Sequence, residues 1–231
     1  MERLSTEPLF YIFFVYGISF IFMSYMVFRK ARTASASPLI NAFYMLAAFG
    51  LTHGVTELVD WLRFIVKTLG SPEIVVLTYL SQIFLIISFV FLLQFGATML
   101  TRNYEKQGIV RTVPLALLGV FILFVLVTGM TDILKIGLLA RYGFGFIGSI
   151  LSSISLFALA NTIKPLGDQK LVNALSMAGF AFACYALFGG LIIKPIAGIP
   201  IQLFRSACAV TVALTSAQMS GIFNYVKGRQ E

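Results

Sequence analysis

Residues 74–100 decide the fold: they read IVVLTYLSQIFLIISFVFLLQFGATML and contain no charged side chain. At about 1.5 Å per residue, a helix of this length exceeds the roughly 30 Å hydrocarbon core of a bilayer. The residues that follow, RNYEK at 102–106, end the run with charged side chains. The stretch therefore predicts a helix that crosses a membrane.

The rest of the chain has the same character. Its 231 residues are 59% hydrophobic and 11% charged, and the mean hydropathy is +0.94. A typical soluble domain has roughly 25% charged residues, and a soluble core of this size could not bury so much apolar surface. This composition excludes a cytosolic enzyme, a nucleic-acid-binding domain and a disulfide scaffold. We expect one all-α, polytopic membrane domain that covers residues 1–231.

Seven apolar runs separated by short segments predict a seven-helix transmembrane bundle. The first run is not read as a signal peptide, because Arg29 and Lys30 follow its apolar core instead of preceding it. Trp61, Arg63 and Lys67 suggest a short interfacial extension of the second helix. The expected spans are about 8–28, 39–62, 74–100, 113–130, 136–162, 171–193 and 201–226.

The Lys and Arg residues between the runs predict the orientation of the bundle, because cytoplasmic loops carry an excess of them. One side collects Arg29, Lys30, Arg32, Arg102, Lys106, Arg111, Lys164, Lys170, Lys227 and Arg229. The other side collects Arg3, Arg63, Lys67, Lys135, Arg141, Lys194 and Arg205. Arg141 and Arg205 lie inside expected helices, so the first side is the more basic. We expect the N-terminus outside and the C-terminus in the cytoplasm. Topology thus accounts for the net charge of +8 without nucleic acid.

The second expected span contains polar residues that lipid should not tolerate. His53, the one histidine of the chain, and Glu57 are four residues apart and share a helix face. Counted from Leu39, His53 lies about 21 Å along the helix, which places it in the outer half of the membrane. Charged groups at that depth usually pair or face the bundle interior. The pair therefore holds helices together, forms a ligand or proton site, or is simply exposed at the membrane interface.

Other polar residues enter the membrane from the same side and predict a pocket in its outer half. We predict that this pocket binds a ligand through His53, Glu57, Arg141, Tyr185, Gln202 and Arg205, with Gln82 in the same layer. We expect Glu57 to be ionised and paired with Arg205, or with Arg141 if the seventh helix is rotated away. A paired buried charge can be retained where a lone one costs several kcal/mol.

The sequence offers no support for enzymatic chemistry, because no Ser, Cys or Lys stands near a base at a recognisable spacing. Cys184 and Cys208 lie inside apolar runs without metal-type spacing, and His53 with Glu57 would supply only two metal ligands. No cofactor is assigned. Haem held by His53 and a methionine is the weaker option. A quinone or a lipid head group fits better, because histidine and arginine can donate to a carbonyl or a phosphate.

Small residues recur at helical spacing in the fifth run, at Gly145, Ser149 and Ser153. Small side chains let neighbouring helix backbones approach closely in membranes. We expect this face to pack inside the bundle, with dimerisation as the alternative.

Three segments resemble the N-terminal seven-helix membrane region of certain bacterial sensor histidine kinases and diguanylate cyclases. They are HGVTELVDW at 53–61, RYGFGFIG at 141–148, and AFACYALFGGL at 181–191 followed by GIPIQLFR at 198–205. Two features depart from the family: the segment 194–199 is abbreviated, and no PAS, kinase or cyclase domain follows within these residues. The resemblance implies signal input, as in two-component systems, across the bacterial cytoplasmic (inner) membrane. The chain would be either the excised input half of a sensor or a free-standing relative that works through partner subunits.

We therefore expect an integral membrane sensor or ligand-binding module that transmits a signal to a cytoplasmic signalling domain. The alternative is a non-catalytic integral subunit of a larger respiratory or electron-transfer complex, which binds quinone or lipid in the same pocket. A transporter is disfavoured, because the chain has no strong internal repeat and few inner-half polar residues. Those polar residues are Gln94, Asn161 and Gln218.

Overall fold

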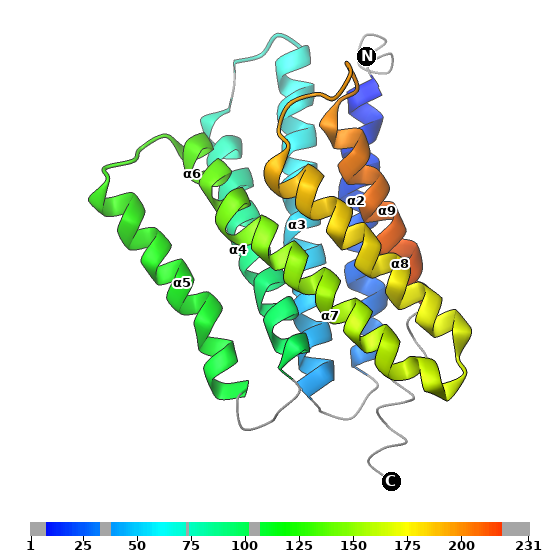
Figure 1. Ribbon diagram of the computed structural model, residues 1–231. Helices are drawn as coiled ribbons and strands as arrows, with labels where there is room; N and C mark the ends of the chain where they lie inside the picture. Colours follow the sequence, from blue (N-terminus) through cyan, green and yellow to red (C-terminus); the bar gives the residue numbers. More distant parts are fainter. Residues whose placement is uncertain (1–7, 33–37, 73, 102–106, 219–231) are drawn as a thin grey trace.

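The computed structural model of the chain describes residues 8–32, 38–72, 74–101 and 107–218. Over these ranges the regular elements are all helices, with one isolated bridge between Ile196 and Ile199. The helices run alternately down and up the bundle (Figure 1). We call the end at which α2 begins the upper end and the opposite end the lower end.

Each expected run contains a helix over the residues that the structure describes, with bounds that differ from the predicted ones by up to six residues. The elements are α2 (Pro8–Ala31), α3 (Pro38–Thr68), α4 (Val75–Leu100), α5 (Gln107–Val127), α6 (Ile133–Ala140), η2 (Arg141–Phe146), α7 (Ile147–Ile163), η3 (Lys164–Leu166), α8 (Gln169–Tyr185), η4 (Ala186–Leu191) and α9 (Ile201–Gln218). Helix α3 continues through Trp61, Arg63 and Lys67 to Thr68, so the predicted extension of the second helix is confirmed.

Within the described ranges, five helical stretches are long and apolar enough to cross a membrane. They are Pro8–Ala31, Leu39–Thr68, Val75–Leu100, Ile133–Leu166 and Gln169–Leu191. The apolar part of α5, Thr112–Val127, is shorter, and α9 is described as far as Gln218. Residues 219–226 of the seventh expected run lie outside the described residues. So do the expected topogenic cations at 3, 102, 106, 227 and 229. The chain is thus a helical protein with the character of a membrane protein.

Local sequence explains where several helices begin. Helices α2 and α3 start at Pro8 and Pro38, where the missing N–H of proline leaves no helical hydrogen bond unmade. The Asp132 carboxylate accepts hydrogen bonds from the first backbone N–H groups of α6, and Asp168 does the same for α8. Gly167, with φ of 78°, makes the turn between α7 and α8.

Two long helices each change from α to π geometry within the bundle. The π segment η2 interrupts the helix made of α6 and α7, and the π segment η4 ends the helix that begins with α8. The two π segments lie against each other. A π segment widens the helix locally and shifts the partners of its carbonyl groups, and such segments are frequent at functional sites.

Helix α3 lies at the centre of the fold. It packs along α2 on one side and α4 on the other, and α9 closes the bundle against α2 and α8. Helix α5 stands apart from the others (Figure 1) and packs mainly against α4, with Phe121 touching Phe144 of η2. The buried core therefore lies among α2, α3, α4, α7, α8 and α9.

The small-residue face of the fifth run packs inside the bundle, as predicted. Gly145, Ser149 and Ser153 are all buried. A methyl group on Gly145 would lie 2.9 Å from the ring of Phe89 in α4, and one on Gly148 would lie 2.9 Å from the backbone nitrogen of Leu93. The absence of side chains here lets α7 and η2 approach α4 closely.

We expect Gly145→Leu to lower the free energy of unfolding in detergent by about 1–3 kcal/mol, because the new side chain must displace the Phe89 ring. Gly143→Leu is the matched control, since a methyl group on Gly143 would have no neighbour within 4 Å. Chemical unfolding of the two variants and the parent makes the comparison. Equal stability of all three proteins would mean that the Gly145 face is not packed as described.

Candidate functional site

The single histidine lies at the centre of the bundle. His53 occupies the midpoint of α3, because that helix extends further at its upper end than the expected span. Its side chain is fully buried, with 0% exposure. The rings of Phe20, Phe49 and Phe89 surround the imidazole, with ring centroids 4.8–5.5 Å away. Only polar groups inside this aromatic cage can therefore reach the imidazole nitrogens.

The Nδ1 atom of His53 is held by Ser88 of α4, at a distance of 2.9 Å. The Ser88 hydroxyl donates its own proton to the carbonyl of Leu85 at 2.7 Å. A hydroxyl has one proton to give, so its oxygen accepts from His53. The hydrogen-bond network thus assigns a proton to Nδ1.

The Nε2 atom of His53 faces two tyrosines from different helices. The hydroxyl of Tyr185 lies 2.7 Å from Nε2, and that of Tyr16 lies 3.4 Å from it. The two hydroxyl oxygens are 3.1 Å apart. Since a neutral imidazole with a proton on Nδ1 can only accept at Nε2, Tyr185 donates to His53 and Tyr16 donates to Tyr185. One directed chain of hydrogen bonds joins α2, α8, α3 and α4.

The carboxylate of Glu57 competes for the same nitrogen. Its Oε1 atom lies 3.5 Å from Nε2 of His53, and the residue is 3% exposed. Two acceptors cannot share a hydrogen bond unless one of them carries a proton. A proton placed between His53 and Glu57 would let Nε2 turn from accepting the Tyr185 hydroxyl to facing Glu57. The site therefore has two hydrogen-bond arrangements that differ by one proton.

The expected ion pair between Glu57 and an arginine is wrong. In the part of the chain that the structure describes, no Lys or Arg nitrogen lies within 4 Å of the Glu57 carboxylate, and the basic side chain that it meets is the neutral His53, at 3.5 Å. Arg205 is 7% exposed and donates to the carbonyls of Phe188 and Ile192, the latter at 3.1 Å.

Arg141 is occupied in the same way. It donates to the carbonyl of Gly189 at 3.4 Å and lies 6.0 Å from the centroid of the Phe89 ring. The π segment η4 leaves carbonyl groups near its end without helical donors, and buried carbonyls need partners. The two guanidinium groups therefore bind backbone oxygens where a carboxylate was expected.

The remaining predicted residues lie nearer the upper end. Gln202 is half-buried in the first turn of α9 and makes no hydrogen bond to another described side chain. Gln82 is buried against Gly137 of α6. The structure thus brings His53, Glu57 and Tyr185 together, attaches the two arginines to η4 beside them, and leaves Gln202 and Gln82 outside the cluster.

A second polar layer lies above the cluster. Asp60 accepts hydrogen bonds from Arg63 and from Ser81, each at 2.8 Å. This layer joins α3 to α4 at the depth where the predicted interfacial residues begin.

Sequence reasoning missed Tyr16 and Ser88. Each is a polar residue near the middle of a largely apolar helix, at about the same depth as His53 in the neighbouring α3. That common depth is the signal that could have identified them, because polar side chains at the centre of a membrane helix usually pair with one another inside the bundle.

The described ranges contain no set of metal-binding side chains. No group of three or more His, Cys, Asp and Glu side chains that could hold a metal ion occurs among those residues. Cys184 and Cys208 are free thiols, half-buried and buried respectively.

Comparison of the chain with known protein families, with curated proteins and with solved structures finds no match in any of the three. The geometry of the site therefore carries the functional argument.

Proposed function

We propose that this chain is an integral membrane signal-input module in which His53 reports a change in protonation to cytoplasmic partners. The observation that carries the proposal is the fully buried His53, whose two nitrogens are held by different helices while Glu57 stands 3.5 Å from Nε2. A buried histidine with alternative partners is a typical device of proton-responsive switches. The interior packing of the cluster favours a proton over a bulky ligand as its input.

A path from this histidine to the last helix supports signal output. Tyr185, which donates to His53, is the residue that precedes η4. Arg205 of α9 donates to the carbonyl of Phe188 within η4 and to that of Ile192, the residue that follows η4. If Nε2 turns to Glu57, Tyr185 loses its acceptor, and the π segment that follows Tyr185 can change its geometry. We propose η4 as the two-state element that both His53 and α9 contact.

Several charged or titratable groups face this histidine from the packed elements. They are Tyr16 of α2, Glu57 of α3, Tyr185 of α8, Arg141 of η2 and Arg205 of α9. The two arginines are held by backbone carbonyls and do not take part in the exchange. The proton in our proposal is therefore the one shared by His53 and Glu57.

The topology that fits this function has seven spans. We propose that α5 and α9 cross the membrane together with the five long apolar stretches, that the N-terminus lies outside, and that the C-terminus lies in the cytoplasm. The support is the excess of Lys and Arg in the loops of one side. The proposed location is the cytoplasmic membrane of a bacterium.

Distances between spin labels at the lower end of the bundle test the proposal. Gln169 at the start of α8 and Gln218 at the end of α9 are both exposed and suit labelling once Cys184 and Cys208 have been replaced by serine. We expect the distance distribution to shift by about 1–2 Å as the pH falls from about 8 to about 5, the scale of helix shifts in switching proteins.

Variants decide whether the shift arises at the cluster. His53→Gln and Tyr185→Phe should abolish the pH response, because each removes one side of the exchangeable hydrogen bond. Thr52→Val should keep it, because the Thr52 hydroxyl bonds within its own helix at 2.8 Å. A parent protein without any pH response, or a Tyr185→Phe variant that responds like the parent, would contradict the proposal.

The alternative function, an integral subunit of a larger membrane complex, has one observation in its favour. Helix α5 stands apart and exposes large apolar side chains, such as Leu126 and Val127, along most of its length. Such a surface suits a partner helix as well as lipid. The mass of the protein purified in mild detergent separates the two functions, since a subunit would be recovered with a stoichiometric partner chain.

A further inference from the structure

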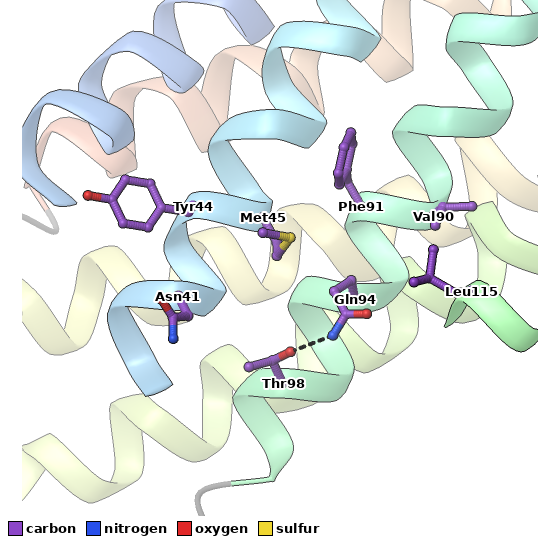
Figure 2. A pocket seen from close by; sticks show the side chains of 8 residues that line it. All are labelled: Asn41, Tyr44, Met45, Val90, Phe91, Gln94, Thr98 and Leu115. Carbon is purple, nitrogen blue, oxygen red and sulfur yellow. Dashed lines mark hydrogen bonds between the residues drawn. The ribbon is translucent and has the colours of Figure 1, made fainter. Parts of the chain in front are cut away.

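A hollow of about 440 Å³ lies between α3, α4 and α5 (Figure 2). Its α3 residues, 41–45, precede His53 by at least eight positions, so the hollow lies closer to the lower end of the bundle. Its volume is in the range of small-molecule sites. The lining residues are Asn41, Tyr44, Met45, Val90, Phe91, Gln94, Thr98 and Leu115. Gln94 lies six residues, or about 9 Å, beyond Ser88 along α4, so the hollow is separate from the histidine cluster.

The amide of Gln94 is the buried polar group of this hollow. Gln94 is 9% exposed, and its Nε2 atom donates to the hydroxyl of Thr98 at 2.9 Å and to the carbonyl of Val110 at 3.5 Å. A backbone carbonyl can only accept, so its position assigns the nitrogen to that side. Figure 2 shows the amide oxygen turned away from Thr98. Within the described residues, that oxygen has no hydrogen-bond donor.

Other polar groups of the lining are also available. Thr98 accepts from Gln94, and its own proton has no acceptor among the described side chains. The amide of Asn41 makes no hydrogen bond to the other lining residues (Figure 2). Among the lining residues that the structure describes, none carries a charge. Tyr44 adds a phenol hydroxyl, and the other walls, formed by Met45, Val90, Phe91 and Leu115, are apolar. A ligand here needs a donor for Gln94 and an acceptor for Thr98 or Asn41.

We infer that this hollow binds a neutral amphiphile whose head bears a hydroxyl group. A hydroxyl both donates and accepts, so it satisfies Gln94 and Thr98 together. The described lining offers neutral hydrogen-bond donors but no cation to balance the charge of a phosphate or a carboxylate, and an oxidised quinone lacks the donor that the Gln94 oxygen needs. The inference stands independently of the function proposed for His53.

A second hollow provides room for the apolar chain of such a ligand. It has a volume of about 450 Å³ and shares Tyr44 with the first. Its other lining residues are mainly apolar side chains of α2 and α3: Ile21, Ser24, Tyr25, Phe28, Ala47, Ala48 and Leu51. The Ser24 hydroxyl is already donated to the carbonyl of Ala47 at 2.7 Å. The two hollows therefore resemble a polar head site and an apolar chain site on either side of Tyr44.

Photolabelling of the purified chain in nanodiscs tests this assignment. Two probes carry the same diazirine-bearing chain, one as a monoacylglycerol and the other as a fatty acid. We expect the monoacylglycerol probe to label α3, α4 and α5 around the hollow, and the fatty-acid probe to label these peptides several-fold less. Gln94→Leu should reduce the monoacylglycerol labelling about fivefold, the effect of one hydrogen bond. Gln82→Leu, on the same helix but outside the hollow, should leave it unchanged.

A second variant and two competing ligands complete the experiment. Leu115→Trp, at a position that is 62% exposed, should fill the hollow and block labelling even if Gln94→Leu proves unstable. Unlabelled monoacylglycerol and an isoprenoid hydroquinone are each added as competitors of the photolabelling. The compound that reduces labelling more strongly identifies the class of ligand that supplies the hydroxyl group. The inference is overturned if both probes label the hollow equally, if neither Gln94→Leu nor Leu115→Trp reduces labelling, or if the oxidised quinone competes as well as its hydroquinone.

Discussion

Replacing His53 with leucine is expected to lower the free energy of unfolding in detergent by about 3 kcal/mol. Leucine fills much of the volume of the imidazole but makes none of its hydrogen bonds. The hydroxyl of Tyr185 and the carboxyl group of Glu57 would then remain buried without their partner, and each such loss costs about 1–3 kcal/mol. The loss should appear as a lower midpoint of denaturant unfolding at an unchanged slope.

Thr52→Val provides the control for this experiment. It is also a change from a polar to an apolar side chain on α3, at the neighbouring position. The Thr52 hydroxyl bonds to the carbonyls of Ala48 and Phe49 within the same helix, so its removal should change stability by less than about 0.5 kcal/mol. Equal losses in the two variants would mean that the hydrogen bonds of His53 contribute nothing beyond helix propensity.

Replacing Arg205 with leucine should cost a similar amount, about 3 kcal/mol. Arg205 is 7% exposed, and its guanidinium group binds the half-buried carbonyls of Phe188 and Ile192, which would lose their donors. Arg205→Lys should recover only part of the loss, because an ammonium group lacks the planar fork that reaches two carbonyls at once.

Arg141 provides the comparison. It makes a single longer bond, 3.4 Å to the carbonyl of Gly189, so Arg141→Leu should cost about 1 kcal/mol. Unfolding curves of the two leucine variants therefore show which arginine contributes more to the free energy of unfolding. A loss for Arg141→Leu as large as that for Arg205→Leu would contradict the assignment of Arg205 as the principal donor to η4.

The helices themselves could be predicted from the sequence because apolar runs of sufficient length permit few other structures. The run at 74–100 became α4 at Val75–Leu100, within one residue of its expected bounds. The first span was predicted to end at Phe28, but α2 continues through the basic residues to Ala31. Charged residues end an apolar run without ending a helix, which is why boundaries at polar positions were predicted less well.

The partners of the two arginines could not be predicted. Sequence patterns indicated a shared depth for Glu57, Arg141 and Arg205, and opposite charges at one depth suggested a salt bridge. The deciding feature was the π segment η4, whose end leaves carbonyl groups in need of donors. No periodicity in the sequence predicts a π segment, although the glycines at 143 and 145 lie within η2 and those at 189 and 190 lie within η4.

Tyr185 and Glu57 were correctly grouped with His53, because their spacing and depth follow from helix geometry alone. Tyr16 and Ser88 were not, since which faces of α2 and α4 turn towards α3 depends on packing between helices. The hollow around Gln94 depends on the same packing: it exists because α5 stands apart from the bundle.

The central claim is that His53 joins four helices through one directed chain of hydrogen bonds, in which Nδ1 donates to Ser88 and Nε2 accepts from Tyr185. Because the chain contains a single histidine, nitrogen-15 NMR of histidine-labelled protein reports on this residue alone. The account predicts one protonated Nδ1 and one unprotonated Nε2 near neutral pH, with the Nε2 resonance moving in Tyr185→Phe as its donor is lost. A proton on Nε2 with Nδ1 bare, or an Nε2 resonance that is the same in Tyr185→Phe as in the parent, would contradict it.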